Sequence, residues 1–350
     1  MSEPTRYRLG TTTRASTVLA LAAVVLVLIL AALPTVAGRG SIQDMIFVFY
    51  MLALAECWNL LAGYAGLVSV GQQAFVGLGG YLLFALTIVA DIDPIAAVLL
   101  SGLIAAIFAV PTAFVVFRLR GPYFAIGSWV VAEVYRLVFA QFKQLGGGTG
   151  TSLPPSVTSE IFGIEWVKTA FEVRSPAARD IISYWIALVL AAGALWLAYL
   201  VLRSRYGLAL FAIRDSEAAA ESAGVDSFRA KLGVYVLVAG ATGMIGALIY
   251  LQKARISPDA AFSVLDWSAY VIFVVIIGGV GTIEGPIVGV ILFYALQHYL
   301  ADFGTWYLIL LGILAIITML FAPKGIWGYV GQRYGVALFP VRRILVRPRE

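Results

Sequence analysis

The chain has 350 residues, of which 61% are hydrophobic and 12% are charged, compared with roughly 45–50% and about 25% in soluble domains. Only a bilayer can act as the solvent for so much apolar surface, which excludes a soluble enzyme, a disordered chain and a small disulfide scaffold. The chain has one cysteine and one histidine, which argues against a zinc site and against Ser-His-Asp chemistry. Its net charge is +5, but its basic residues do not form the stripe that is typical of a nucleic-acid-binding protein.

Ten apolar segments are predicted to be membrane spans, because a span needs about 20 mostly apolar residues. In chain order they cover roughly 17–37, 44–62, 72–90, 95–117, 122–141, 181–202, 231–251, 267–282, 285–300 and 305–322. The sequence therefore predicts an all-α polytopic membrane protein with about ten transmembrane helices. The first segment follows several arginines and also fits a signal peptide.

Basic residues orient these predicted spans. If the N-terminus is cytoplasmic and the ten spans alternate, 16 basic residues fall inside and seven fall outside, as the positive-inside rule requires. Both termini are then cytoplasmic. The predicted divisions are an N-terminal tail over 1–16, a transmembrane domain over 17–322 and a basic C-terminal tail over 323–350, with an external loop at 142–180 and a cytoplasmic loop at 203–230.

The stretch 59–80 interrupts the apolar pattern with six glycines and four polar side chains, and a second glycine-rich break lies at 278–289. Glycines allow helices to approach closely, or allow a helix to unwind where its backbone lines a cavity or is buried in protein. Both close packing and a broken segment that lines a translocation path fit this pattern. The path hypothesis includes Asn59, Ser69, Gly71, Gln72, Gln73, Gly278, Gly279 and Gly281.

Two charged side chains lie within the fifth predicted span. Glu133 and Arg136 are three residues apart, so they share a helix face and can neutralise each other. Charge inside a membrane is costly and by default suggests function. The pair is therefore either a structural lock or a site that contacts the zwitterionic backbone of a substrate, and both residues are candidates for the translocation path.

The loop 203–230 is the longest predicted cytoplasmic loop and carries mixed charge. Asp215 or Ser216 can cap a short helix whose first turn contains Glu217, and Gly224 suits the position after its end. A helix of about two turns is marginal alone and needs a partner to dock on. A solvated connector is the alternative interpretation.

The external loop contains apolar residues between Ile161 and Phe171 with the spacing of a short interfacial helix. This helix is either a docking platform for an external partner or a helix that rests on lipid headgroups.

The energy source is expected to lie outside this chain. None of the five lysines stands in the Gly-Lys-Ser/Thr context of a phosphate-binding loop. Either an ion gradient drives transport or a separate subunit hydrolyses ATP, and the docking helix favours the separate subunit. We expect no catalytic residue, no metal and no cofactor in this chain.

Five segments, in the same order along the chain, resemble one family. They are 58–75, 119–126 together with Glu133 and Arg136, 204–210, 212–221 and 278–289. These segments resemble the LivM-type permeases of branched-chain amino-acid ABC importers, which are bacterial inner-membrane proteins.

The resemblance implies a permease that moves branched-chain or similar hydrophobic amino acids by alternating access and is not itself an enzyme. It implies a second, LivH-type permease, two cytoplasmic ATP-binding subunits, a periplasmic substrate-binding protein and the lipid bilayer as partners, and no nucleic acid. By analogy, the coupling helix that contacts the ATP-binding subunits involves Arg214, Asp215, Ser216, Glu217, Ala218, Ala219, Glu221 and Gly224.

The sequence departs from the expected pattern at two positions. The general ABC-permease pattern places a glycine six positions after the coupling-helix glutamate, whereas Gly224 is seven after Glu217; either the register shifts by one residue or Glu221 shares the role. Gln72 stands where many members carry histidine, so this position is not expected to relay protons. An importer of urea, short amides or another amino-acid-like solute, and an ion-coupled secondary transporter, remain alternative functions.

Overall fold

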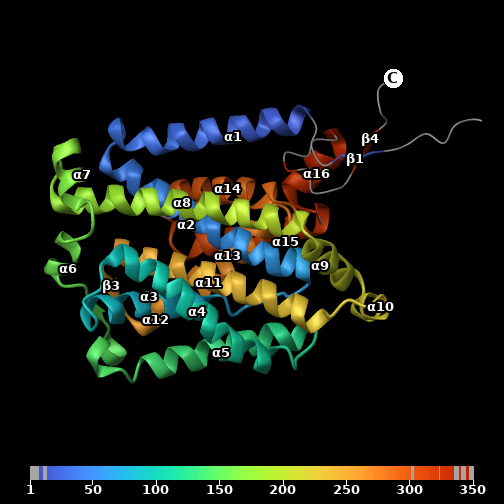
Figure 1. Cartoon of the computed structure of the whole chain (residues 1–350), viewed down its shortest axis with the longest axis horizontal. Coiled ribbons are helices and arrows are strands. Elements are labelled where there is room, and N and C mark those ends of the chain that lie inside the picture. Colours follow the sequence, from blue (N-terminus) through green and yellow to red (C-terminus); the bar gives the residue numbers. More distant parts are fainter. Residues whose placement is uncertain are drawn as a thin grey trace, which may run out of the picture.

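A computed structural model of the chain (Figure 1) describes residues 8–10, 14–300, 303–322, 324–334, 339 and 344–346. The predicted tails 1–16 and 323–350 lie in part outside the described residues. The helices are α1 (Arg14–Ala32), α2 (Arg39–Asn59), α3 (Gln73–Ile88), α4 (Pro94–Val116), α5 (Pro122–Phe139), α6 (Pro155–Ser159), α7 (Ile164–Phe171), α8 (Ser175–Arg203), α9 (Arg205–Asp215), α10 (Glu217–Ser222), α11 (Ser227–Lys253), α12 (Pro258–Ala261), α13 (Tyr270–Gly278), α14 (Glu284–Leu300), α15 (Thr305–Phe321) and α16 (Gly325–Tyr334).

Short strands and irregular helical turns complete the fold. Strand β1 (Arg8–Gly10) pairs antiparallel with β4 (Ile344–Val346), and β2 (Thr151–Ser152) pairs antiparallel with β3 (Arg255–Ile256). Two π-helical segments, Leu60–Tyr64 and Leu265–Ala269, continue α2 and precede α13. Single 3-10 turns lie at Leu33–Thr35, Lys143–Leu145 and Gly147–Thr149.

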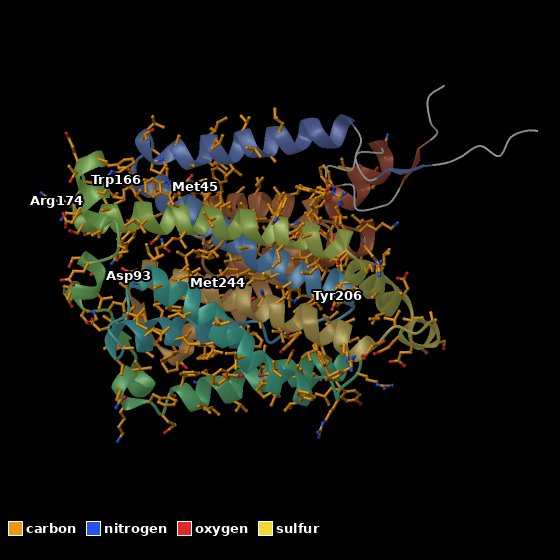
Figure 2. All side chains as sticks on the ribbon, viewed as in Figure 1. Met45, Asp93, Trp166, Arg174, Tyr206 and Met244 are labelled. Atoms are coloured by element: carbon orange, nitrogen blue, oxygen red, sulfur yellow. The ribbon has the colours of Figure 1, made fainter. Side chains whose placement is uncertain are left out.

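The long helices form a bundle with two distinct ends (Figure 1). Helices α6 and α7 lie at one end, called here the α7 end, and helices α9 and α10 lie at the opposite end, called here the α10 end. Trp166 and Arg174 mark the α7 end, whereas Tyr206 lies toward the α10 end (Figure 2). The β1–β4 pair also lies at the α10 end. The two loops that the sequence predicts on opposite sides of a membrane are thus at opposite ends of the bundle.

Small residues allow the central helices to pack closely, since packing rather than hydrophobic burial drives helix association in lipid. Helix α11 packs against both α3 and α4, and α2 packs against α8. A methyl group added to Gly79 of α3 would lie 2.0 Å from the carbonyl oxygen of Gly243, and one added to Gly246 would lie 2.2 Å from that of Val76. Many of the glycines in the first break therefore serve helix packing.

All ten predicted spans coincide with helices, but fewer helices meet the criteria for crossing a membrane alone. Within the described residues, six are long and apolar enough, and a seventh is obtained if α5 and the turns after it, bent by 91°, count as one broken span. Helix α3 has 16 residues and α14 has 17. The structure is therefore an all-α, multi-pass membrane protein.

Several predicted boundaries differ from the structure. The predicted helix over 267–282 ends at Gly278, because Gly279 has a φ of +138° that the helix cannot continue. Helix α8 begins at Ser175, inside the predicted external loop, where Pro176 fits the first helical turn. The loop 203–230 contains two helices, α9 and α10, rather than one.

Candidate functional site

The two glycine-rich breaks meet inside the bundle. Asn59, which is fully buried, accepts a hydrogen bond from the backbone N–H of Gly281 (2.8 Å) and donates one to the carbonyl oxygen of Thr282 (2.8 Å). A methyl group on Gly63 would lie 2.6 Å from the nitrogen of Gly281. The Asn59 side chain thus provides hydrogen-bond partners for the unwound backbone of a segment more than 200 residues away. Buried irregular backbone requires such partners.

The second break is shaped by close backbone contacts. A methyl group on Gly278 would lie 1.9 Å from the carbonyl oxygen of Gly285. The hydroxyl of Thr282 donates to the carbonyl oxygen of Gly279 (2.8 Å) and accepts from the N–H of Gly285 (3.1 Å). Gly278, Gly279 and Gly281 therefore build a tight turn between α13 and α14.

The predicted polar residues of the first break are buried and support its backbone. Ser69 accepts the N–H of Gly71 on its hydroxyl (3.1 Å), and its carbonyl accepts the indole N–H of Trp58 (2.7 Å). Gln72 donates to the carbonyl oxygen of Leu54 (3.0 Å), and the Gln73 side-chain oxygen accepts from the hydroxyl of Ser268. These contacts make the break a defined structure rather than a loose linker.

Helix α5 packs directly on the first break. The hydroxyl of Ser128 accepts a hydrogen bond from the N–H of Val70 (3.0 Å). A methyl group on Gly71 would lie 2.2 Å from the carbonyl oxygen of Ser128. Gly71 is therefore required for the contact between this break and α5.

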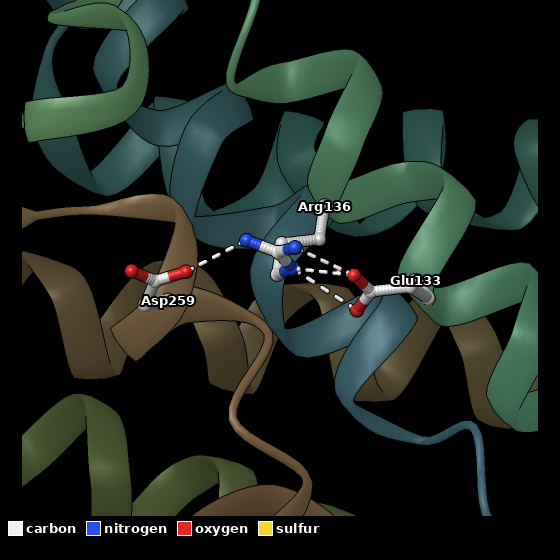
Figure 3. A network of polar contacts seen from close by, with 3 residues as sticks. All are labelled: Glu133, Arg136 and Asp259. Atoms are coloured by element: carbon white, nitrogen blue, oxygen red, sulfur yellow. Dashed lines mark hydrogen bonds and ion pairs between the residues drawn. The ribbon is translucent and has the colours of Figure 1, made fainter.

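The predicted Glu133–Arg136 pair forms and includes a third residue (Figure 3). The Arg136 guanidinium donates to both carboxylate oxygens of Glu133 at 2.6–3.0 Å, and its Nη1 donates to Oδ1 of Asp259 on α12 at 2.7 Å. The pairing of Glu133 with Arg136 is local, whereas Asp259 lies 123 residues further along the chain. No pattern in the sequence linked Asp259 to this pair.

The three charged side chains are open to their surroundings. The exposed fraction is 45% for the Glu133 side chain and 82% for that of Asp259, while Arg136 is 28% exposed. Their formal charges sum to one negative charge. Apolar side chains on the same helix, Trp129, Val130, Val134, Leu137 and Val138, are also exposed. This outward face of α5 therefore carries charge among apolar residues.

Helix α10 is a short helix with well-formed caps. The Ser216 hydroxyl accepts from the N–H of Ala219 (3.3 Å), so of the two predicted caps the structure uses Ser216. Gly224 has a φ of +86°. The N–H of Val225 bonds the carbonyl of Ala220 (3.0 Å), and the N–H of Gly224 bonds that of Glu221 (2.9 Å), the Schellman arrangement. The predicted role of Gly224 in ending this helix is confirmed.

One ion pair and one hydrogen bond attach the α9–α10 corner to the bundle. The Lys231 ammonium of α11 lies 2.5 Å from the carboxylate of Glu217. Arg214 donates to the carbonyl oxygen of Gly63 (2.9 Å) and pairs with Asp215 (3.1 Å). Because Gly63 also lies against Gly281, contacts run from Arg214 of α9, just before α10, to both glycine breaks.

The opposite side of α10 faces outward. Ala218, Ala219 and Ser222 are exposed, whereas Ala220 is buried. Because these exposed side chains are small, another protein can approach the backbone of α10 closely on this side.

Comparison with known proteins identifies the family. Residues 40–321 match the family described as the branched-chain amino acid transport system permease component. The chain belongs to this family. The matched region of the permease includes both glycine breaks, α5 and α10, and begins after α1. No solved structure matches this permease.

Curated relatives extend the comparison over most of the permease. It is 29% identical over 316 residues to the high-affinity branched-chain amino acid transport system permease protein LivM of Escherichia coli K12, covering 87% of this chain and 73% of that protein. The LivM protein of Salmonella typhimurium is 28% identical over 314 residues, covering 86% and 73%. A probable LivM of Methanocaldococcus jannaschii is 23% identical over 251 residues, covering 66% of each chain.

Proposed function

We propose that this permease is one of the two membrane subunits of an ATP-driven ABC importer that moves branched-chain amino acids across the bacterial inner membrane by alternating access. Family membership and the LivM relatives support the transported class. The observation that carries the mechanism is the chain of contacts from Arg214, at the end of α9 next to α10, to Gly63 and Gly281, because it links the α9–α10 corner at the surface to both breaks in the bundle.

In this proposal the α10 end is cytoplasmic and the α7 end is external, with about ten spans and both termini inside. The loops predicted at the cytoplasmic end are rich in arginine, as the positive-inside rule favours. They contain Arg118, Arg120, Arg203, Arg205 and Arg214. The β1–β4 pair joins segments near the two termini at that same end.

Two ATP-binding subunits act on the cytoplasmic face through α10. Its exposed Ala218, Ala219 and Ser222 form the docking surface, and Asp215 and Glu221 flank it. When ATP draws the two ATP-binding subunits together, α10 moves with them. Lys231 passes this movement to α11, and Arg214 passes it to the first glycine break, where unwound backbone bends more readily than a continuous helix.

The substrate path runs along the outward face of α5, between this chain and a second, LivH-like permease. Exposed carboxylates are costly against lipid, so Glu133 and Asp259 are expected to face water or protein. The two glycine breaks form the framework behind this face and set the inward-open and outward-open conformations of the path. Their residues in this role are Asn59, Ser69, Gly71, Gln72, Gln73, Gly278, Gly279 and Gly281. A periplasmic substrate-binding protein docks at the α7 end, where Phe162 and Trp166 are exposed.

The test is reconstitution of the permease with its companion subunits in proteoliposomes, followed by uptake of labelled leucine, isoleucine, valine, urea and acetamide. ATP-dependent uptake of the three amino acids, with no uptake when the ATP-binding subunits are omitted, is the expected result. Uptake of urea or acetamide instead would assign the alternative substrate class. Uptake driven by an ion gradient without ATP would contradict the proposal and favour a secondary transporter.

A further inference from the structure

A cavity of about 580 Å³ lies between the first glycine break and the α9–α10 corner. Its walls come from the segment after α2, the α4–α5 turn, α10 and the beginning of α11. Ligand pockets commonly have volumes of about 300–1,000 Å³. The cavity is therefore large enough to hold a small molecule beside the helix that the proposed mechanism moves.

Aromatic side chains form one wall of this cavity. Phe117 lies between Phe124 and Phe228, with ring centroids 6.2 Å and 6.0 Å away, and all three line the cavity together with Leu67. Such a wall favours an apolar group of a few carbon atoms.

Five charged residues also line the cavity, and three of them already have partners. Lys231 pairs with Glu217, and Arg214 pairs with Asp215 and Gly63. The side chains of Arg120 and Glu221 form neither an ion pair nor a hydrogen bond within the described part of the chain. Within the described residues, one cation and one anion without side-chain partners therefore border this cavity, which also has an aromatic wall.

We infer that this cavity is a regulatory site for a zwitterionic amino acid with an apolar side chain, bound from the cytoplasmic side. Arg120 pairs with the carboxylate of the ligand, Glu221 with its ammonium group, and the side chain of the ligand contacts Phe117, Phe124 and Phe228. The identification of the ligand as leucine, isoleucine or valine rests on the proposed function. A zwitterionic phospholipid has similar charges, but most of its acyl chains would not fit in this volume.

The position of the cavity determines the effect of the ligand. A molecule held between α10 and the segment that contains Leu67 holds the coupling helix against the first break and resists its movement. Accumulated amino acid in the cytoplasm therefore slows the importer. This is feedback by the transported substrate at a site separate from the α5 face.

Binding is tested on the permease–ATPase complex, without the binding protein, in nanodiscs that lack ethanolamine lipids. Labelled L-leucine is expected to bind, whereas 4-methylpentanoate and 3-methylbutylamine, which each lack one of the two charges, compete at least tenfold less well than L-valine. Arg120→Gln and Glu221→Gln each weaken leucine binding about tenfold, because each removes one ion pair. Arg118→Gln, a neighbouring exposed arginine that does not line the cavity, is the matched control and keeps wild-type affinity.

The regulatory effect is tested with proteoliposomes in which leucine is loaded on the cytoplasmic side of the importer. Loaded leucine is expected to slow ATP-dependent uptake several-fold in the wild type and in Arg118→Gln, and to have at least fivefold less effect in Arg120→Gln. Leucine binding that neither variant weakens, or inhibition that Arg120→Gln retains, overturns the regulatory site. A wild-type importer that takes up no branched-chain amino acid at all overturns the proposed function instead.

Discussion

Gly63 shows how a single residue decides whether the two breaks can touch. Its missing side chain leaves room for Gly281, and its carbonyl oxygen accepts a hydrogen bond from Arg214. Any larger residue must push these backbones apart, since buried protein is close-packed.

We therefore expect Gly63→Ala to lower the free energy of unfolding by about 1–3 kcal/mol, the usual range for overpacking, and to reduce uptake several-fold. Denaturant unfolding of the detergent-purified protein and uptake in proteoliposomes measure the two effects. Gly193→Ala is the control, because a methyl group at Gly193 in α8 meets nothing within 4 Å. Equal behaviour of the two variants would contradict the packing role of Gly63.

Arg136 holds two carboxylates that would otherwise repel each other across α5 and α12. We expect Arg136→Met to reduce uptake at least tenfold, and Arg136→Lys to reduce it less, because lysine keeps the charge but loses the planar fork that contacts both partners. Arg229→Met removes an exposed pair with Asp226 at the same spacing along a helix and should change uptake less than twofold. Equal uptake by Arg136→Met and Arg229→Met would show that the three-residue cluster is dispensable.

At the scale of elements, the ion pair between Glu217 of α10 and Lys231 of α11 attaches the exposed helix α10 directly to the bundle. Glu217 does not point away toward a partner, as a coupling residue in direct contact would; its carboxylate is paired with Lys231 of the same chain. The docking surface that we propose on α10 is instead the exposed face formed by the small residues Ala218, Ala219 and Ser222. We therefore propose that Glu217 acts by fixing α10 to its own subunit.

Reversing the charge of this pair tests the attachment. Glu217→Arg places two cations together and is expected to abolish uptake while membrane insertion, measured by immunoblot of washed membranes, stays normal. The double variant Glu217→Arg with Lys231→Glu restores an ion pair and should recover a substantial part of the uptake. Normal uptake by the single variant would refute the coupling role of α10, and failure of the double variant to recover would show that Glu217 contacts another subunit.

At the scale of the whole molecule, the proposed orientation predicts which residues each side of the membrane can reach. The single native cysteine, Cys57, is buried. Labelling by a membrane-impermeant thiol reagent therefore reports on cysteines that are introduced at exposed positions. Ser222→Cys on α10 is expected to react only in inverted vesicles, and Ser156→Cys on α6 only in intact spheroplasts. Reaction of both from the same side would contradict the alternation of spans and the proposed topology.

The features that the sequence predicted well depend on neighbours within one or two helical turns. Apolar length marked the helices, the spacing of Glu133 and Arg136 placed them on one face, and Ser216 and Gly224 marked the ends of α10. These features were predictable because helix geometry sets distances between residues three or four positions apart. The family assignment also followed from local segments that come in the same order along the chain as in the family.

Only the tertiary structure decided which distant segments meet. Asn59 bonds a turn 222 residues away, Asp259 completes the cluster around Arg136, and Arg214 joins α9 to Gly63. The surfaces of membrane helices are uniformly apolar, so hydropathy does not indicate which helix faces pack together. The pairing depends on small residues that allow close helix packing and on hydrogen bonds between buried polar groups. By itself, the sequence determined a multi-pass helical permease, and the packing of its glycine breaks determined how the α9–α10 corner is connected to them.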